Sequence, residues 1–145
     1  GFFGGNFLTG KFSMKIGIDR MILLGTIAQI FGMGMSLIIS ILGFGTAFTF
    51  FGFCIFIGIG NGLTLANSTA GMLSIRPSVA GTASGIGGAI QIGGGSALAT
   101  LAGFLLSNSE GAYALQIIMF LSAFMGFICI LYVIRRTKIV MTYDN

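Results

Sequence analysis

The stretch AGTASGIGGAIQIGGGSALATLAGFLL, residues 80–106, decides how this chain folds. It carries no charge, holds eight glycines, and exceeds the roughly 20 residues that a helix needs to cross a bilayer. With about 3.6 residues per helical turn, its small and bulky residues separate onto opposite sides of the helix. The small face comprises Gly81, Gly85, Gly88, Gly95, Ala99 and Gly103, and the bulky face Ile86, Ile90, Leu101 and Phe104.

Two interpretations of this small face stay open. In membranes, small residues let two helix backbones approach closely, because lipid leaves little hydrophobic force to bring helices together. The face therefore serves tight packing alone, or it also lets the helix slide against a neighbour during a transport cycle.

The composition indicates an integral membrane protein. The 145 residues are 55% hydrophobic and only 7% charged, against roughly 25% charged residues in soluble domains. No long basic run suggests nucleic acid as a partner. Cys54 and Cys129 lie in apolar spans and are expected to act as small hydrophobic residues. Histidine is absent, and neither Ser84 nor Ser96 has a basic or acidic partner at its depth, so we expect no enzyme activity and no metal.

The chain in order predicts an all-α membrane protein with four transmembrane helices and the end of a fifth. The opening apolar segment is too short to span a bilayer, which favours a fragment whose N-terminal part is missing. The predicted segments are a helix end (residues 1–9), a basic cytoplasmic loop (10–20), helices (21–42 and 46–67), a cytoplasmic loop (71–78), the glycine-rich helix (80–106), an outer turn (107–111), a helix (112–134) and a cytoplasmic tail (135–145).

Basic residues alternate along these connections. Lys and Arg lie in the first loop, at Arg76 and at residues 135–138, whereas residues 43–45 and 107–111 contain neither. Since short cytoplasmic loops are enriched in Lys and Arg, the C-terminus is predicted to be cytoplasmic.

Polar residues inside the spans are the candidates for function. Gln29, Asn61 and Gln91 occur one per span, and such amides either hydrogen-bond to neighbouring helices or line a substrate cavity. Gln116, near the outer end of its span, is expected at the membrane interface. Gly58, Gly60 and Gly62 surround Asn61, and we expect them to weaken the helix there. No complete span carries a charge at its centre, so no proton carrier is evident.

One block resembles a known family. NGLTLANSTAGMLSIRPSVAGTASGIGGAIQ, residues 61–91, is similar to the tenth-to-eleventh helix region of major facilitator superfamily drug–proton antiporters, most of all the Bcr/CflA group. In the first loop, Gly10, Lys15 and Gly17 resemble the second copy of the superfamily's cytoplasmic loop motif. Met14 occupies the motif's acidic position, and Asp19 stands where a basic residue is common.

The resemblance implies a twelve-helix carrier of which this chain supplies the end of helix 8 through helix 12. Such a carrier lies in the bacterial inner membrane and exports varied drug-like amphipathic compounds by alternating access, with the proton gradient as its energy source and no cofactor. Its partners would be the lipid bilayer and the missing N-terminal half, which would carry the proton-binding acid. The alternative is a small four-span protein that oligomerises through its glycine-rich helix.

Overall fold

Helices account for almost all of the computed structural model, which describes residues 1–75, 77–107 and 113–143. The elements are α1 (Phe2–Ile16), α2 (Ile18–Ile39), the short π-helix η1 (Ser40–Phe44), α3 (Ala47–Ile75), the 3₁₀ turn η2 (Pro77–Val79), α4 (Ala80–Ser107) and α5 (Tyr113–Tyr143). Four segments are long and apolar enough to cross a membrane: Ile18–Phe44, Ala47–Ser74, Pro77–Ser107 and Tyr113–Thr137. No strand occurs in the described ranges. The predicted fold class, four long apolar helices preceded by a shorter one, is confirmed.

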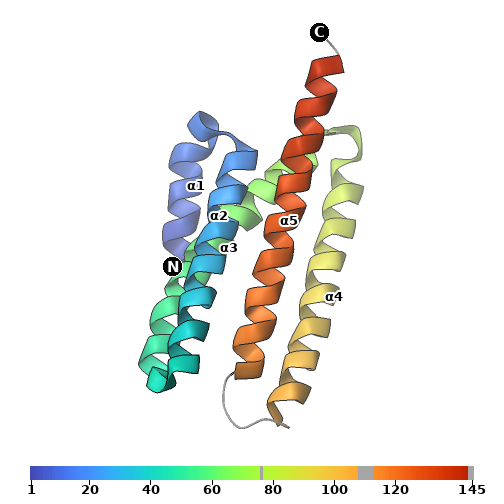
Figure 1. Ribbon diagram of the computed structural model, residues 1–145. Coiled ribbons are helices and arrows are strands. Elements are labelled where there is room, and N and C mark those ends of the chain that lie inside the picture. The colour runs from blue at the N-terminus through green and yellow to red at the C-terminus, as the bar shows by residue number, and fades with distance from the viewer. Residues whose placement is uncertain (76, 108–112, 144–145) are drawn as a thin grey trace.

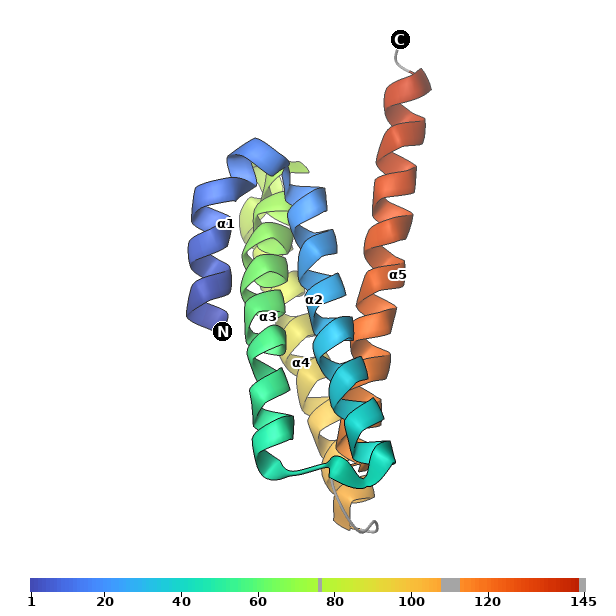
Figure 2. The ribbon, with the colours of Figure 1, turned by 60° about the vertical axis from the view of Figure 1, so that its left-hand side comes forward.

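The long helices run up and down in turn, and α2 lies at the centre of their contacts (Figure 1). Helix α2 packs most extensively on α3 and also on α5, while α1 covers the other side of α3. Helix α4 touches α3 and α5 only lightly. In Figure 2 the C-terminal part of α5 rises away from the rest of the bundle. The α1–α2 turn, the start of α4 and the end of α5 lie toward one end of the molecule (Figure 1). Lys15 lies in the last turn of α1, Arg20 in the first turn of α2, and Arg135 and Arg136 in the C-terminal part of α5, so basic residues lie toward that end.

Glycines bring α1, α2 and α3 into close contact. A Cβ atom on Gly62 would lie only 2.6 Å from the backbone nitrogen of Asn6, and one on Gly58 would lie 2.8 Å from that of Phe2. On the other side of α3, a Cβ on Gly25 of α2 would lie 2.8 Å from the carbonyl oxygen of Gly60. Real Cβ atoms do not approach backbone so closely, so only glycine permits these crossings.

The glycines around Asn61 therefore act differently from the expectation. Helix α3 runs as one α-helix from Ala47 to Ile75, through Gly58, Gly60 and Gly62. The glycines lower the intrinsic helix propensity, but the close contacts with α1 and α2 that they permit favour the same helix.

The predicted first loop is mostly helical. Helix α1 continues to Ile16 and α2 begins at Ile18, so the predicted boundaries at residues 10–20 are wrong. Gly17 alone turns the chain, with φ 94° and ψ 148°, a conformation that is essentially restricted to glycine. The loop is short because one residue in this conformation is enough to redirect the backbone.

Two other predicted boundaries also shift. Helix α3 continues to Ile75, well into the predicted loop at residues 71–78, and α5 continues to Tyr143 through most of the predicted tail. A helix that leaves the hydrocarbon core does not have to stop there, because the interfacial layer adds several ångströms on each side. The uncharged turn at residues 43–45 is confirmed, with Gly43 at φ 83°. The predicted outer turn at 107–111 lies outside the described residues apart from Ser107, the last residue of α4.

Candidate functional site

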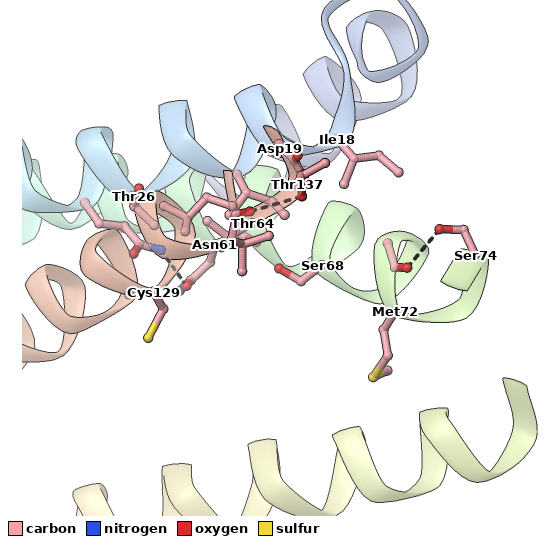
Figure 3. A pocket seen from close by; sticks show the side chains of 16 residues that line it. Ile18, Asp19, Thr26, Asn61, Thr64, Ser68, Met72, Ser74, Cys129 and Thr137 are labelled. Atoms are coloured by element: carbon pink, nitrogen blue, oxygen red, sulfur yellow. Dashed lines mark hydrogen bonds between the residues drawn. The ribbon is translucent and has the colours of Figure 1, made fainter. Parts of the chain in front are cut away.

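A groove of about 660 Å³ runs between α2, α3 and α5 (Figure 3). Each helix contributes residues at three-, four- and seven-residue steps, the spacing of one helical face. Its polar lining comprises Asp19, Thr26, Gln29, Asn61, Thr64, Ser68, Ser74 and Thr137, and its larger apolar residues are Ile18, Ile22, Met72, Ile130 and Val133. This volume and this mixture of side chains are typical of sites for small organic molecules.

Gln29 and Asn61 meet inside this groove. The Gln29 Nε2 donates a hydrogen bond of 2.9 Å to the Asn61 Oδ1, joining α2 to α3. Gly60 permits the approach, because the Gln29 side chain occupies the place where a Cβ at residue 60 would lie. Two of the three sequence candidates for a cavity are thus brought together.

The amide pair also separates two cavities. Both residues line a second cavity of about 250 Å³, which continues along the same seam toward Met33, Ile57 and Met119. The pair therefore lies between a larger groove that reaches the basic end of the bundle and a smaller cavity nearer its middle.

Apart from the Asp19 carboxylate and the Ser68 hydroxyl, the hydrogen-bonding groups left over in the groove belong to the amides. Thr26 donates to the Leu23 carbonyl at 2.9 Å and Thr64 to the Gly60 carbonyl at 2.8 Å, so both hydroxyl protons are engaged within their own helices. Within the described chain, by contrast, the Gln29 Oε1 and the Asn61 Nδ2 have no hydrogen-bond partner. The pair thus retains one acceptor and one donor for a bound molecule.

Asp19 supplies the groove's charge. It lies in the first turn of α2, is half-buried, and lines the end of the groove together with Ser74 and Thr137. It forms no ion pair or side-chain hydrogen bond with any residue that the structure describes. In the sequence, Asp19 is conspicuous only as a departure from the loop motif.

Gln91 lies apart from the other two amides. It is exposed on α4 and does not line the groove or the cavity beyond the amide pair. The predicted small face of α4 is likewise open: apart from the nearby backbone of α4 itself, a Cβ on Gly81, Gly85, Gly88, Gly95 or Gly103 would have no atom within 4 Å. Only Gly87, outside that face, has a close neighbour among the glycines of α4, the end of the Met72 side chain.

The three residues of the loop motif do not form a site in this structure. Gly10 is helical with open space around it, Lys15 is exposed in the last turn of α1, and Gly17 forms the turn.

Two further amides, Asn67 and Gln116, are buried and join neighbouring helices, which the sequence did not predict. Asn67 is 1% exposed; its Nδ2 donates to Thr9 at 3.2 Å and to the Leu63 carbonyl at 2.7 Å, and its Oδ1 accepts from Ser13. Thr9 and Ser13 are four residues apart, a spacing that places two hydroxyls on one helical face and that could have indicated this contact.

Gln116 is buried between helices, whereas the expectation that it lies at the membrane interface concerns its depth in the bilayer and stays a prediction. It is 2% exposed, and its Nε2 donates to Ser36 at 3.2 Å and Ser40 at 2.9 Å across the α2–α5 contact. Tyr113 donates to the Ser40 carbonyl at 2.9 Å beside it. Position near a span's end indicates depth only, whereas the pair of serines on α2 determines which way Gln116 faces.

No protein-family model matches the chain, and neither a curated protein nor a solved structure matches it.

Proposed function

We propose that this chain is the C-terminal part of a secondary active transporter that exports drugs or other small amphipathic compounds. The observation that carries the proposal is the groove between α2, α3 and α5, with the Gln29–Asn61 pair inside it. A polar pair that keeps a free donor and acceptor between apolar walls, within segments able to span a membrane, suits an amphipathic molecule.

The proposal assigns the carrier to the major facilitator superfamily, close to the Bcr/CflA group, through the resemblance of residues 61–91. Export then occurs by proton antiport in a bacterial inner membrane, with no cofactor and with a cytoplasmic C-terminus. The gathering of basic residues at one end of the bundle supports this orientation. The open glycine face of α4 supports a partner helix outside this chain, in the N-terminal half of the same carrier.

Replacing Gly95 by Leu in the full-length protein tests the proposal. A leucine on the small face would prevent close approach of a partner helix, so we expect export to be abolished while membrane insertion persists. The control is Ala97→Leu, which adds a leucine to the bulky face of α4. The measurements are export of a fluorescent amphipathic dye from cells and the amount of protein in the membrane. Undiminished export by Gly95→Leu would refute the proposed role of this face.

Proton coupling needs its own measurement. Inverted vesicles containing the full-length protein and carrying an acid interior should lose protons when the exported dye is added outside. Dye export without dye-induced proton movement would support a transporter and contradict proton antiport.

The open face of α4 also favours a second candidate, a four-span protein that oligomerises through this helix. In that case Gly95→Leu would dissociate oligomers seen by cross-linking in membranes, and neither the variant nor the wild type would export dye.

A further inference from the structure

The proposed function gives no role to the Asp19 carboxylate at the end of the groove. The Asp19 carboxylate is half-buried beside Ile18 and Ile22, and no cation among the described residues neutralises it. The four basic residues placed at this end, Lys15, Arg20, Arg135 and Arg136, are all exposed and outside the groove lining. An unpaired charge between apolar walls attracts a counter-ion more strongly than one in open solvent, because the low dielectric weakens screening.

The groove joins this charge to the amide pair. Asp19, Ile22, Thr26 and Gln29 follow one another along one face of α2, and Gln29 lies ten positions after Asp19. At about 1.5 Å of rise per residue, Asp19 and Gln29 are separated by about 15 Å along the helix axis. Ile130 and Val133 of α5 line the same groove and add apolar surface to it.

We propose that the groove binds an elongated amphipathic cation, with its positive group at Asp19 and a polar group at the Gln29–Asn61 pair. The inference rests on the proposed function, since it names the class of compound that the carrier would take. Charge complementarity at Asp19 and the free donor and acceptor of the amide pair define the two ends of the ligand. The apolar walls require a flat or slender hydrophobic middle.

The test uses a matched pair of dyes. The probe is a styryl N-methylpyridinium dye with a terminal carboxamide, and the reference is the neutral styrylpyridine of the same length. Binding to the full-length protein in phosphatidylcholine nanodiscs is measured by fluorescence, without transport. We expect the wild type to bind the cation about ten-fold more tightly than the neutral dye.

Substitutions of Asp19 then locate the preference. In Asp19→Asn the affinity ratio of the two dyes should fall close to one, and in Asp19→Glu it should be largely retained. The control Ser78→Lys adds the same unit of positive charge at an exposed position at this end of the bundle, and should leave the ratio unchanged. A ratio that Asp19→Asn leaves intact, or that Ser78→Lys lowers equally, would overturn the site.

The native cysteines give a readout that does not depend on a variant folding. Cys129 lines the groove and Cys54 does not. The cationic dye should therefore slow the reaction of Cys129 with N-ethylmaleimide and leave that of Cys54 unchanged. Equal labelling of Cys129 with and without the dye would contradict binding in the groove, as would the absence of saturable binding, which indicates that lipid or another helix occupies the space.

The outcomes for the site and for the proposed function are distinguishable. If binding depends on Asp19 but the protein exports neither dye, the proposed site is supported and the proposed transport function is refuted. If the wild type exports dye but Asp19→Asn does not change the affinity ratio, the transport function is supported and the proposed site is refuted.

Discussion

Gly17 is the only residue between α1 and α2, and its backbone has φ 94° and ψ 148°. A side chain there would meet no other atom within 4 Å, so space does not explain the glycine. Backbone conformation does, because L-residues adopt this region only under strain. Gly10, in the same loop motif, is helical and equally uncrowded, so the two glycines differ only in their dihedral angles.

Gly17→Ala is therefore expected to destabilise the protein, whereas Gly10→Ala is not. The strained backbone should cost about 1–3 kcal/mol at residue 17, and removing a helical glycine should gain about 0.5–1 kcal/mol at residue 10. Thermal unfolding of the purified full-length variants in detergent, followed by circular dichroism, measures both. A Gly17→Ala variant as stable as Gly10→Ala would mean that the turn adopts another conformation.

The candidate site could be predicted from the sequence only in part. A mid-span amide is recognisable by its polarity, so Gln29 and Asn61 were identifiable. Their pairing depends on how α2 and α3 are rotated against each other, which is determined by Gly25 and Gly60 meeting at the crossing. Asn67 and Gln116 face inward through other contacts, of α3 with α1 and of α5 with α2, and one span's sequence does not reveal its neighbour.

At the scale of elements, length and hydrophobicity were sufficient to predict the four long helices. The helix ends were not predictable, because continuing a helix beyond the hydrocarbon core costs little and no proline stops α3 before Pro77. The glycines of α3 had two interpretations in sequence, weakness or contact. Only the positions of α1 and α2 show that these glycines serve close helix contacts rather than weakening the helix.

Gly62→Ala should separate α1 from α3. An added Cβ would lie 2.6 Å from the Asn6 nitrogen and 2.7 Å from the Phe2 carbonyl oxygen, and backbone cannot yield as a flexible side chain does. We expect a loss of about 1–3 kcal/mol, the usual cost of overpacking. Gly52→Ala is the matched control, since it lies in the same helix with open space around it.

The measurement is the thermal stability of both full-length variants in detergent. Thermal stability is preferred to a disulfide cross-link between Thr9→Cys and Gly62→Cys, because a cysteine at residue 62 would itself add a side chain at the crowded position. If Gly62→Ala unfolds at the same temperature as Gly52→Ala, the close crossing of α1 and α3 is not maintained in the membrane protein.

For the whole molecule, the orientation in the membrane follows from which turns and helix ends lie at the same end, rather than from any single loop. The turn at Gly17, the start of α4 and the end of α5 lie toward one end of the molecule, and the turn at residues 43–45 lies toward the opposite end (Figure 1). The groove with Asp19 reaches the first of these ends. Which end faces the cytoplasm therefore also decides from which side a cation would enter the groove.

Because Lys and Arg remain on the cytoplasmic side of short connections, we expect the Gly17 end to face the cytoplasm. In a full-length protein carrying Cys54→Ser and Cys129→Ser, the single replacements Ser78→Cys and Ala47→Cys report the two ends, since both positions are exposed. A membrane-impermeant maleimide added to intact cells should label Ala47→Cys and spare Ser78→Cys, and inverted vesicles should reverse the result. The opposite labelling would place the acidic end of the groove outside the cell, where a cytoplasmic cation would first have to pass the Gln29–Asn61 pair before reaching Asp19.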